Sequence, residues 1–101
     1  MAIAYIHEFD VGADRTTSNY DQIHQRLGLD EKPADGLIVH VAGFSGDKFR
    51  MIDIWESAEQ EKRYRMQRLY PIIREVAGAD GAEFGPPRTQ SYELHHVIAP
   101  R

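Results

Sequence analysis

The sequence contains no cysteine among its 101 residues. This excludes disulfide bonds, thiolate catalysis and a cysteine-ligated zinc site. No apolar run approaches the ~20 residues that a membrane-spanning helix needs. The first residues also lack the basic start and long apolar stretch of a signal peptide. We therefore expect a cytoplasmic protein that does not enter a membrane.

Basic residues do not gather into a stripe that could neutralise a run of phosphates. The formal net charge is −4, and the basic cluster formed by Arg63, Arg65 and Arg68 is diluted by glutamates. Nucleic acid is therefore not an expected partner. Glycine-rich phosphate or dinucleotide motifs are also missing, and the scattered histidines lack the spacing of a helical metal site, so we expect no metal.

The composition is that of one small domain. A chain of 101 residues with 42% apolar residues can bury one core, so we expect a single domain over residues 1–101. A domain of this size leaves much of its surface exposed after folding. Pairing with a second copy is a common remedy.

Hydrophobic periodicity predicts four strands and two helices. Alternation of apolar and polar residues indicates a strand, whereas apolar residues three or four apart indicate an amphipathic helix. The expected strands cover residues 2–9, 37–44, 48–56 and 89–98, and the expected helices cover 17–27 and 58–77.

Turn and capping residues separate these elements. Residues 45–47 (Ser-Gly-Asp) are typical of a hairpin turn between the second and third strands. Ser57 and Gln60 fit a capping box at the start of the second helix. Pro71 lies inside that helix and predicts a kink.

The element order β-α-β-β-α-β predicts an α+β fold of the ferredoxin-like type. Right-handed crossovers and short connections favour an antiparallel four-stranded sheet with two helices on one face. The second and third strands carry apolar residues at both parities, which predicts burial on both faces. Because the sequence offers no second helix layer, we expect another subunit's sheet to cover the other face.

Residues 36–41 (GLIVHV), 53–57 (DIWES) and 69–71 (LYP) form a recognisable pattern. It resembles the dimeric α+β barrel superfamily, especially its antibiotic-biosynthesis-monooxygenase-like branch, over nearly the whole chain. The resemblance implies a homodimer with a pocket between the sheet and the helices of each subunit. The superfamily includes cofactor-free monooxygenases of aromatic polyketides, haem-degrading enzymes, lactone isomerases and polyketide cyclases, so the fold does not select the function.

Two positions bear on this choice. Glu61 stands six residues after Trp55, where proteins of this type usually carry an aromatic side chain, whereas Tyr64 keeps the second aromatic position. The second helix contains no histidine, the residue most diagnostic of haem ligation in the superfamily. The resemblance therefore implies chemistry without a cofactor.

Trp55 and Asp53 share one strand face. Trp55 could form the wall of an aromatic-substrate pocket or anchor the core beneath the second helix. Asp53 is costly to bury unless it is paired. It could orient a histidine, act as a base, or bridge to an arginine such as Arg50 or Arg68.

His40 lies in the middle of the second strand, and its parity places it on the face opposite to Asp53 and Trp55. It could be a satisfied structural group or a proton shuttle. Tyr5 and His7 share a face of the first strand. Such a pair suits proton removal from carbon with stabilisation of the enolate, although a structural role is equally open.

One stripe of the second helix carries Glu61, Tyr64, Arg65 and Arg68. The i,i+4 spacing of Glu61 and Arg65 predicts an ion pair of the kind that is usually solvated. If the stripe faces the sheet instead, Glu61 becomes a candidate base.

Together with these residues, the resemblance implies a small cofactor-independent monooxygenase that acts on an aromatic or polyketide-like substrate. A polyketide cyclase or isomerase with His/Tyr acid–base chemistry and a non-catalytic ligand-binding dimer remain open. The expected catalytic groups are His7, Asp53, Tyr5 and His40, and the expected substrate-binding groups are Trp55, Tyr64, Glu61, Arg68 and Met51.

Overall fold

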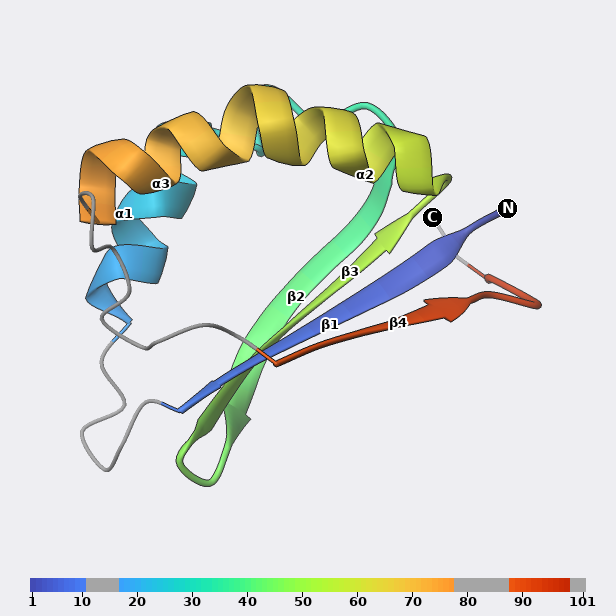
Figure 1. Cartoon of the computed structure of the whole chain (residues 1–101), viewed down its shortest axis with the longest axis horizontal. Coiled ribbons are helices and arrows are strands. Elements are labelled where there is room, and N and C mark those ends of the chain that lie inside the picture. Colours follow the sequence, from blue (N-terminus) through green and yellow to red (C-terminus); the bar gives the residue numbers. More distant parts are fainter. Residues whose placement is uncertain (11–16, 78–87, 99–101) are drawn as a thin grey trace.

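One antiparallel sheet carries the helices on one face (Figure 1). The computed structural model of the chain describes residues 1–10, 17–77 and 88–98. The strands are β1 (Ile3–Asp10), β2 (Leu37–Ser45), β3 (Lys48–Trp55) and β4 (Arg88–Glu93), in the sheet order β2-β3-β1-β4. The helices are α1 (Ser18–Leu27) and a longer one made of α2 (Ala58–Tyr64), η1 (Arg65–Leu69) and α3 (Tyr70–Ala77). The predicted α+β ferredoxin-like architecture is confirmed.

The longer helix is continuous through Pro71, and Figure 1 shows it as a bowed rod. The backbone N–H of Gln60 donates to Oγ of Ser57 at 3.2 Å, so Ser57 caps the helix as predicted. The irregularity expected at Pro71 takes the form of the π-helical segment η1 just before it. There the N–H of Tyr70 donates to the carbonyl of Arg65, five residues earlier.

The turn between β2 and β3 decides which residues of β2 face the helices. Ser45 pairs with Lys48, so the turn contains only residues 46–47, the first of which has a φ of +62° that favours glycine. The register therefore places His40 directly opposite Asp53, on the same face of the sheet. The prediction that His40 faces the other way is wrong, because it assumed a turn that is one residue longer.

β4 is shorter than predicted and ends at Glu93 rather than at residue 98. Its partner β1 begins at Ile3, which pairs with Glu93. One further bond joins the N–H of Leu94 to the carbonyl of Ala2 at 2.9 Å. This is the last backbone hydrogen bond between the two segments within the described residues.

The most deeply buried side chains lie between the helices and the sheet. Trp55 is 1% exposed, and Phe49 and Leu27 are each 4% exposed. The described part of the chain contains no helix long and apolar enough to cross a membrane.

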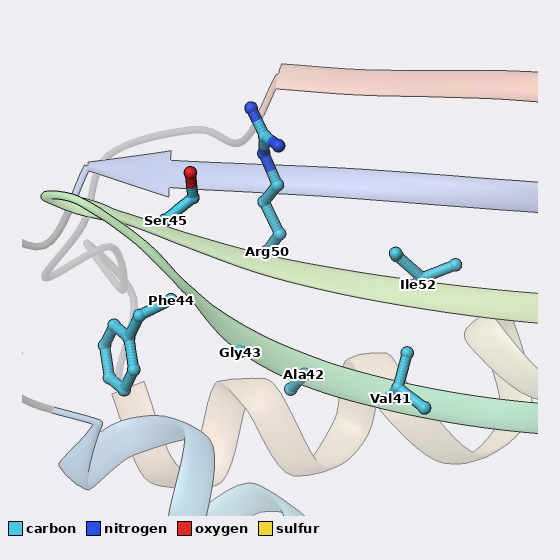
Figure 2. A pocket seen from close by; sticks show the side chains of 7 residues that line it. All are labelled: Val41, Ala42, Gly43, Phe44, Ser45, Arg50 and Ile52. Atoms are coloured by element: carbon cyan, nitrogen blue, oxygen red, sulfur yellow. The ribbon is translucent and has the colours of Figure 1, made fainter.

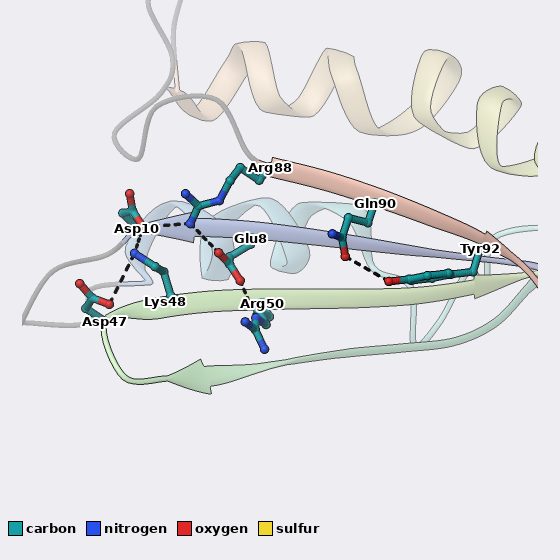
Figure 3. A network of polar contacts seen from close by, with 8 residues as sticks. All are labelled: Glu8, Asp10, Asp47, Lys48, Arg50, Arg88, Gln90 and Tyr92. Atoms are coloured by element: carbon teal, nitrogen blue, oxygen red, sulfur yellow. Dashed lines mark hydrogen bonds and ion pairs between the residues drawn. The ribbon is translucent and has the colours of Figure 1, made fainter.

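No helix of the described residues covers the other face of the sheet. Val41 and Tyr92 remain 49% and 51% exposed there. Figure 2 shows a shallow hollow beside β2 and β3, where Val41, Arg50 and Ile52 point away from the helices. Toward one end of this face lies the network drawn in Figure 3, in which the carboxylate of Glu8 accepts hydrogen bonds from Arg50 and Arg88.

Candidate functional site

A row of polar side chains crosses the sheet on the side that faces the helices. The orientation follows from two ring contacts: Trp55 packs on Tyr64 of α2 at 5.1 Å between centroids, and Phe49 packs on Tyr20 of α1 at 5.0 Å. Residues of β3 with the same parity therefore face the helices. In register across the sheet, the row consists of Ser91, Tyr5, Asp53 and His40.

His40 lies at the centre of a hydrogen-bonded chain. Its Nδ1 bonds to Oδ1 of Asp53, and its Nε2 lies 2.8 Å from the hydroxyl of Tyr20 on α1. An ionised carboxylate can only accept, so Nδ1 carries the proton, and in the neutral imidazole Nε2 then accepts the hydrogen bond of the Tyr20 hydroxyl. The side chains of His40 and Asp53 are 19% and 18% exposed. Of the roles considered for Asp53, the geometry supports the orientation of a histidine.

His24 lies one turn along α1 from Tyr20 and stacks against this chain. Its ring centroid lies 4.7 Å from that of His40 and 4.2 Å from that of Tyr20. Burial lowers the pKa of His24 to about 4, so its imidazole is neutral at neutral pH. Tyr20 and His24 were not among the candidate site residues predicted from the sequence. The signal that could have found them is that both carry a polar group on a core-facing stripe.

Tyr5 and His7 form the second group on this side of the sheet. Their rings are parallel within 3°, with centroids 6.4 Å apart. Nδ1 of His7 lies 3.0 Å from Oγ1 of Thr89, whereas its Nε2 has no hydrogen-bond partner within the described ranges. Burial lowers the pKa of His7, and it raises the pKa of Tyr5. His7 is therefore a neutral imidazole near neutral pH, and its Nε2 is an available proton acceptor in the tautomer whose Nδ1 donates to Thr89.

Glu61 of α2 faces the sheet rather than solvent. Only 7% of it is exposed, and its carboxylate accepts two hydrogen bonds from Nε of Arg65, at 3.1 and 3.3 Å. Its negative charge acts to raise the pKa values of Tyr5 and His7. The expectation of a solvated surface pair is therefore wrong. Glu61 and Arg65 both lie close enough to Tyr5 and His7 to affect their pKa values.

Aromatic and apolar side chains surround the polar row. The indole N–H of Trp55 is buried and has no acceptor among the residues that the structure describes. Tyr64 packs against Trp55, and burial raises its pKa to about 12. Met51 is partly buried and lies in register between His7 and Ala42.

Arg68 of η1 links the long helix to the end of α1 and to the loop that follows it. One of its guanidinium nitrogens donates to the carbonyls of Leu27 and Lys32, at 3.0 and 2.9 Å. It thereby satisfies the C-terminal end of α1 and fixes the loop that follows. The guanidinium carbon also lies 5.8 Å from the ring centroid of Tyr64.

The structure thus brings Tyr5, His7, Asp53 and His40 to one side of the sheet, where all four remain partly accessible. Within the described residues, no group of three or more histidine or acidic side chains is placed to hold a metal ion.

No family model matches the sequence, and no curated protein matches it either. Solved structures do resemble the fold. SnoaB from Streptomyces nogalater, a cofactor-independent oxygenase, is 10% identical over 98% of each chain with a TM-score of 0.66. A candidate antibiotic biosynthesis monooxygenase from Bordetella bronchiseptica is 16% identical over 96% of this chain and 98% of its own, with a TM-score of 0.65.

A third similar structure is NE2512 of Nitrosomonas europaea, a protein of unknown function. It is 15% identical over 99% of this chain and 95% of its own, with a TM-score of 0.71. Identities this low establish the shared architecture and leave the chemistry to the site itself. The chain has the ferredoxin-like α+β fold of the antibiotic biosynthesis monooxygenase-like proteins.

Proposed function

We propose that the protein is a small cofactor-independent monooxygenase that acts on an aromatic or polyketide-like phenol. The observation that carries this proposal is the convergence of Tyr5, His7, Asp53 and His40 on the helix-facing side of the sheet, where they stay partly accessible. The likeness in fold to SnoaB supports it.

The chemistry requires an acidic substrate, such as an anthrone, and an acceptor for its proton. The neutral His7 removes a proton from the reactive carbon through Nε2, and the hydroxyl of Tyr5 donates a hydrogen bond to the resulting enolate oxygen. The electron-rich anion then reacts directly with molecular oxygen. The methylene carbon becomes a carbonyl, and the second oxygen atom leaves as water, so the substrate supplies all the electrons.

The remaining side chains bind the substrate in this proposal. Trp55, Tyr64 and Met51 supply the wall against which an aromatic ring packs. Glu61, neutralised by Arg65, contributes an acceptor at the rim. Arg68 acts through Tyr64, whose ring lies beside its guanidinium group.

We propose that a second copy covers the open face of the sheet. Val41 is 49% exposed there, and Tyr92 is 51% exposed. An apolar sheet face of this kind needs a cover, and an isologous dimer provides one. We expect Val41→Arg to convert the dimer into monomers in sedimentation equilibrium. Met66→Arg is the matched control, because Met66 is 54% exposed on the helix instead. Equal dimerisation of both variants would contradict this interface.

Oxygen uptake tests the enzymatic proposal. Wild-type protein freed of metals is mixed with dithranol, a dihydroxyanthrone, and we expect oxygen to be consumed faster than in protein-free buffer. His7→Gln should lower kcat/KM by about 10²-fold, the usual contribution of a general base. His96→Gln alters an exposed histidine outside the site and should have no effect. Uptake no faster than in buffer would overturn the monooxygenase proposal.

A cyclase or isomerase is the second candidate, because the Tyr5 and His7 pair supplies an acid and a base without oxygen. Conversion of a polyketide-like substrate under anaerobic conditions would favour it over the monooxygenase. Tight binding of phenols with no conversion under either condition would indicate the third possibility, a ligand-binding dimer.

A further inference from the structure

The mechanism proposed above uses His7 for the proton on carbon and leaves the chain Tyr20–His40–Asp53 without a role. This chain has a defined order, because Asp53 fixes the proton on Nδ1 of His40 and directs the lone pair of Nε2 at the Tyr20 hydroxyl, 2.8 Å away. Tyr20 comes from α1, whereas its partners come from β2 and β3. Such a link between separate elements is costly to build with polar groups unless it is fully paired.

We propose that Tyr20, His40 and Asp53 form a proton relay that ionises the phenolic hydroxyl of a bound aromatic ligand. This relay rests on the proposed function, because it concerns the same helix-facing side of the sheet and the same class of ligand. It adds a second proton-transfer group, Tyr20, that handles oxygen-bound protons.

The relay moves two protons in one direction. The ligand hydroxyl gives its proton to the Tyr20 oxygen, and the former Tyr20 proton passes to Nε2 of His40. The products are a phenolate ligand and an imidazolium, and the imidazolium keeps its hydrogen bond to the Asp53 carboxylate. No other acceptor is needed, because the positive charge appears next to an existing negative one.

Tyr20 does not need to ionise in this sequence. Burial raises its pKa, with Asp53 and Asp21 adding to the effect, so a free tyrosinate is disfavoured. In the relay Tyr20 is a neutral hydroxyl both before and after the transfer. Its ring is held by an edge contact with Phe49, 5.0 Å between centroids, which fixes the direction of the hydroxyl.

The groups around His40 permit it to become charged. His24 stacks on it from α1, and burial keeps that second imidazole neutral. Asp53 of β3 is its carboxylate partner, and Tyr20 is its hydroxyl partner. Burial lowers the pKa of His7 on β1, and a positive charge on His40 lowers it further. Neither of these two neighbouring imidazoles therefore opposes the imidazolium with a positive charge near neutral pH.

Binding of alizarin tests the relay without any turnover. Alizarin is a dihydroxyanthraquinone whose visible absorption band moves to longer wavelength when a hydroxyl ionises. It is titrated with wild-type protein and with Tyr20→Phe, His40→Gln and Tyr92→Phe, at a pH where free alizarin is neutral. Tyr92→Phe is the matched control, because it removes a tyrosine hydroxyl on the opposite face of the sheet and keeps the ring on the proposed dimer surface.

We expect bound alizarin to be ionised by the wild type and by Tyr92→Phe, and to remain neutral in Tyr20→Phe and His40→Gln. Tyr20→Phe removes only a hydroxyl, and its far-ultraviolet circular dichroism should match the wild type. Failure of the wild type to bind or to ionise alizarin overturns the relay, and so does full ionisation by Tyr20→Phe. If the wild type ionises alizarin but consumes no oxygen with dithranol, the relay is supported and only the monooxygenase proposal is contradicted.

Discussion

Replacement of His24 should remove a defined part of the pH dependence of folding stability. In the folded protein burial lowers the pKa of His24 from 6.5 to about 4. Between these two values the unfolded chain binds the proton and the folded chain does not, so the free energy of unfolding falls as the pH is lowered. The stabilisation is fully present above about pH 6.5 and is lost as the pH falls through about 4.

The size of the effect follows from the two pKa values. A pKa difference of one unit corresponds to about 1.36 kcal/mol, so the difference between 6.5 and about 4 sets an upper limit of about 3 kcal/mol. His24 retains contact with solvent. Screening reduces the effect, and we expect about 1–2 kcal/mol.

Urea unfolding measures this difference. The free energy of unfolding is determined at about pH 7 and about pH 4 for the wild type and for His24→Phe, at one protein concentration. Phe keeps the ring that stacks on Tyr20 and His40. Other groups, such as Glu8 and Asp10, titrate in both proteins. Their contributions to the pH dependence of the free energy of unfolding therefore cancel when the two proteins are compared. The exposed His96→Phe is the matched control. An equal loss of stability in the wild type and in His24→Phe would refute the reasoning.

Two further substitutions test the contacts that support the site. Arg68→Met should lower the free energy of unfolding by about 1–3 kcal/mol in urea, because the carbonyls of Leu27 and Lys32 lose a charged donor; an unchanged midpoint would show that these bonds contribute nothing. Trp55→Ala should cost about 3–5 kcal/mol, since it removes a side chain that is 1% exposed. A loss below about 1 kcal/mol would contradict its place in the core.

Most of the fold could be predicted from the sequence because its signals are local. The alternation of apolar and polar residues predicted the strands, and the capping box of Ser57 and Gln60 predicted the start of the second helix. The end of β4 could not be predicted in this way. It depends on where β1 begins, at Ile3, and hence on pairing between residues distant in the chain.

The position of His40 shows how the length of one turn decides which face of the sheet a side chain occupies. The turn at residues 46–47 is one residue shorter than the Ser-Gly-Asp turn that the sequence suggested. A shift of one residue reverses every side chain of a strand. Near the start of β2 a bulge between Leu37 and Val39 shifts the register again. Parity alone therefore could not reveal the pairing of His40 with Asp53.

The residues that Tyr20 and His24 of α1 contact were not predictable from the sequence. Tyr20 and His24 fit the spacing of a core-facing stripe, and spacing does not say which strand such a stripe meets. Their contact with His40 arises from packing α1 on the helix-facing side of β2.

Incubation of dithranol with the wild-type protein under heavy-isotope oxygen gas tests the proposed chemistry most directly. Mass spectrometry of the anthraquinone product should show one oxygen atom taken from the gas, in excess of the protein-free reaction, with the other recovered in water. Product formation that does not exceed the protein-free reaction, or a product without the heavy isotope, would contradict a monooxygenase.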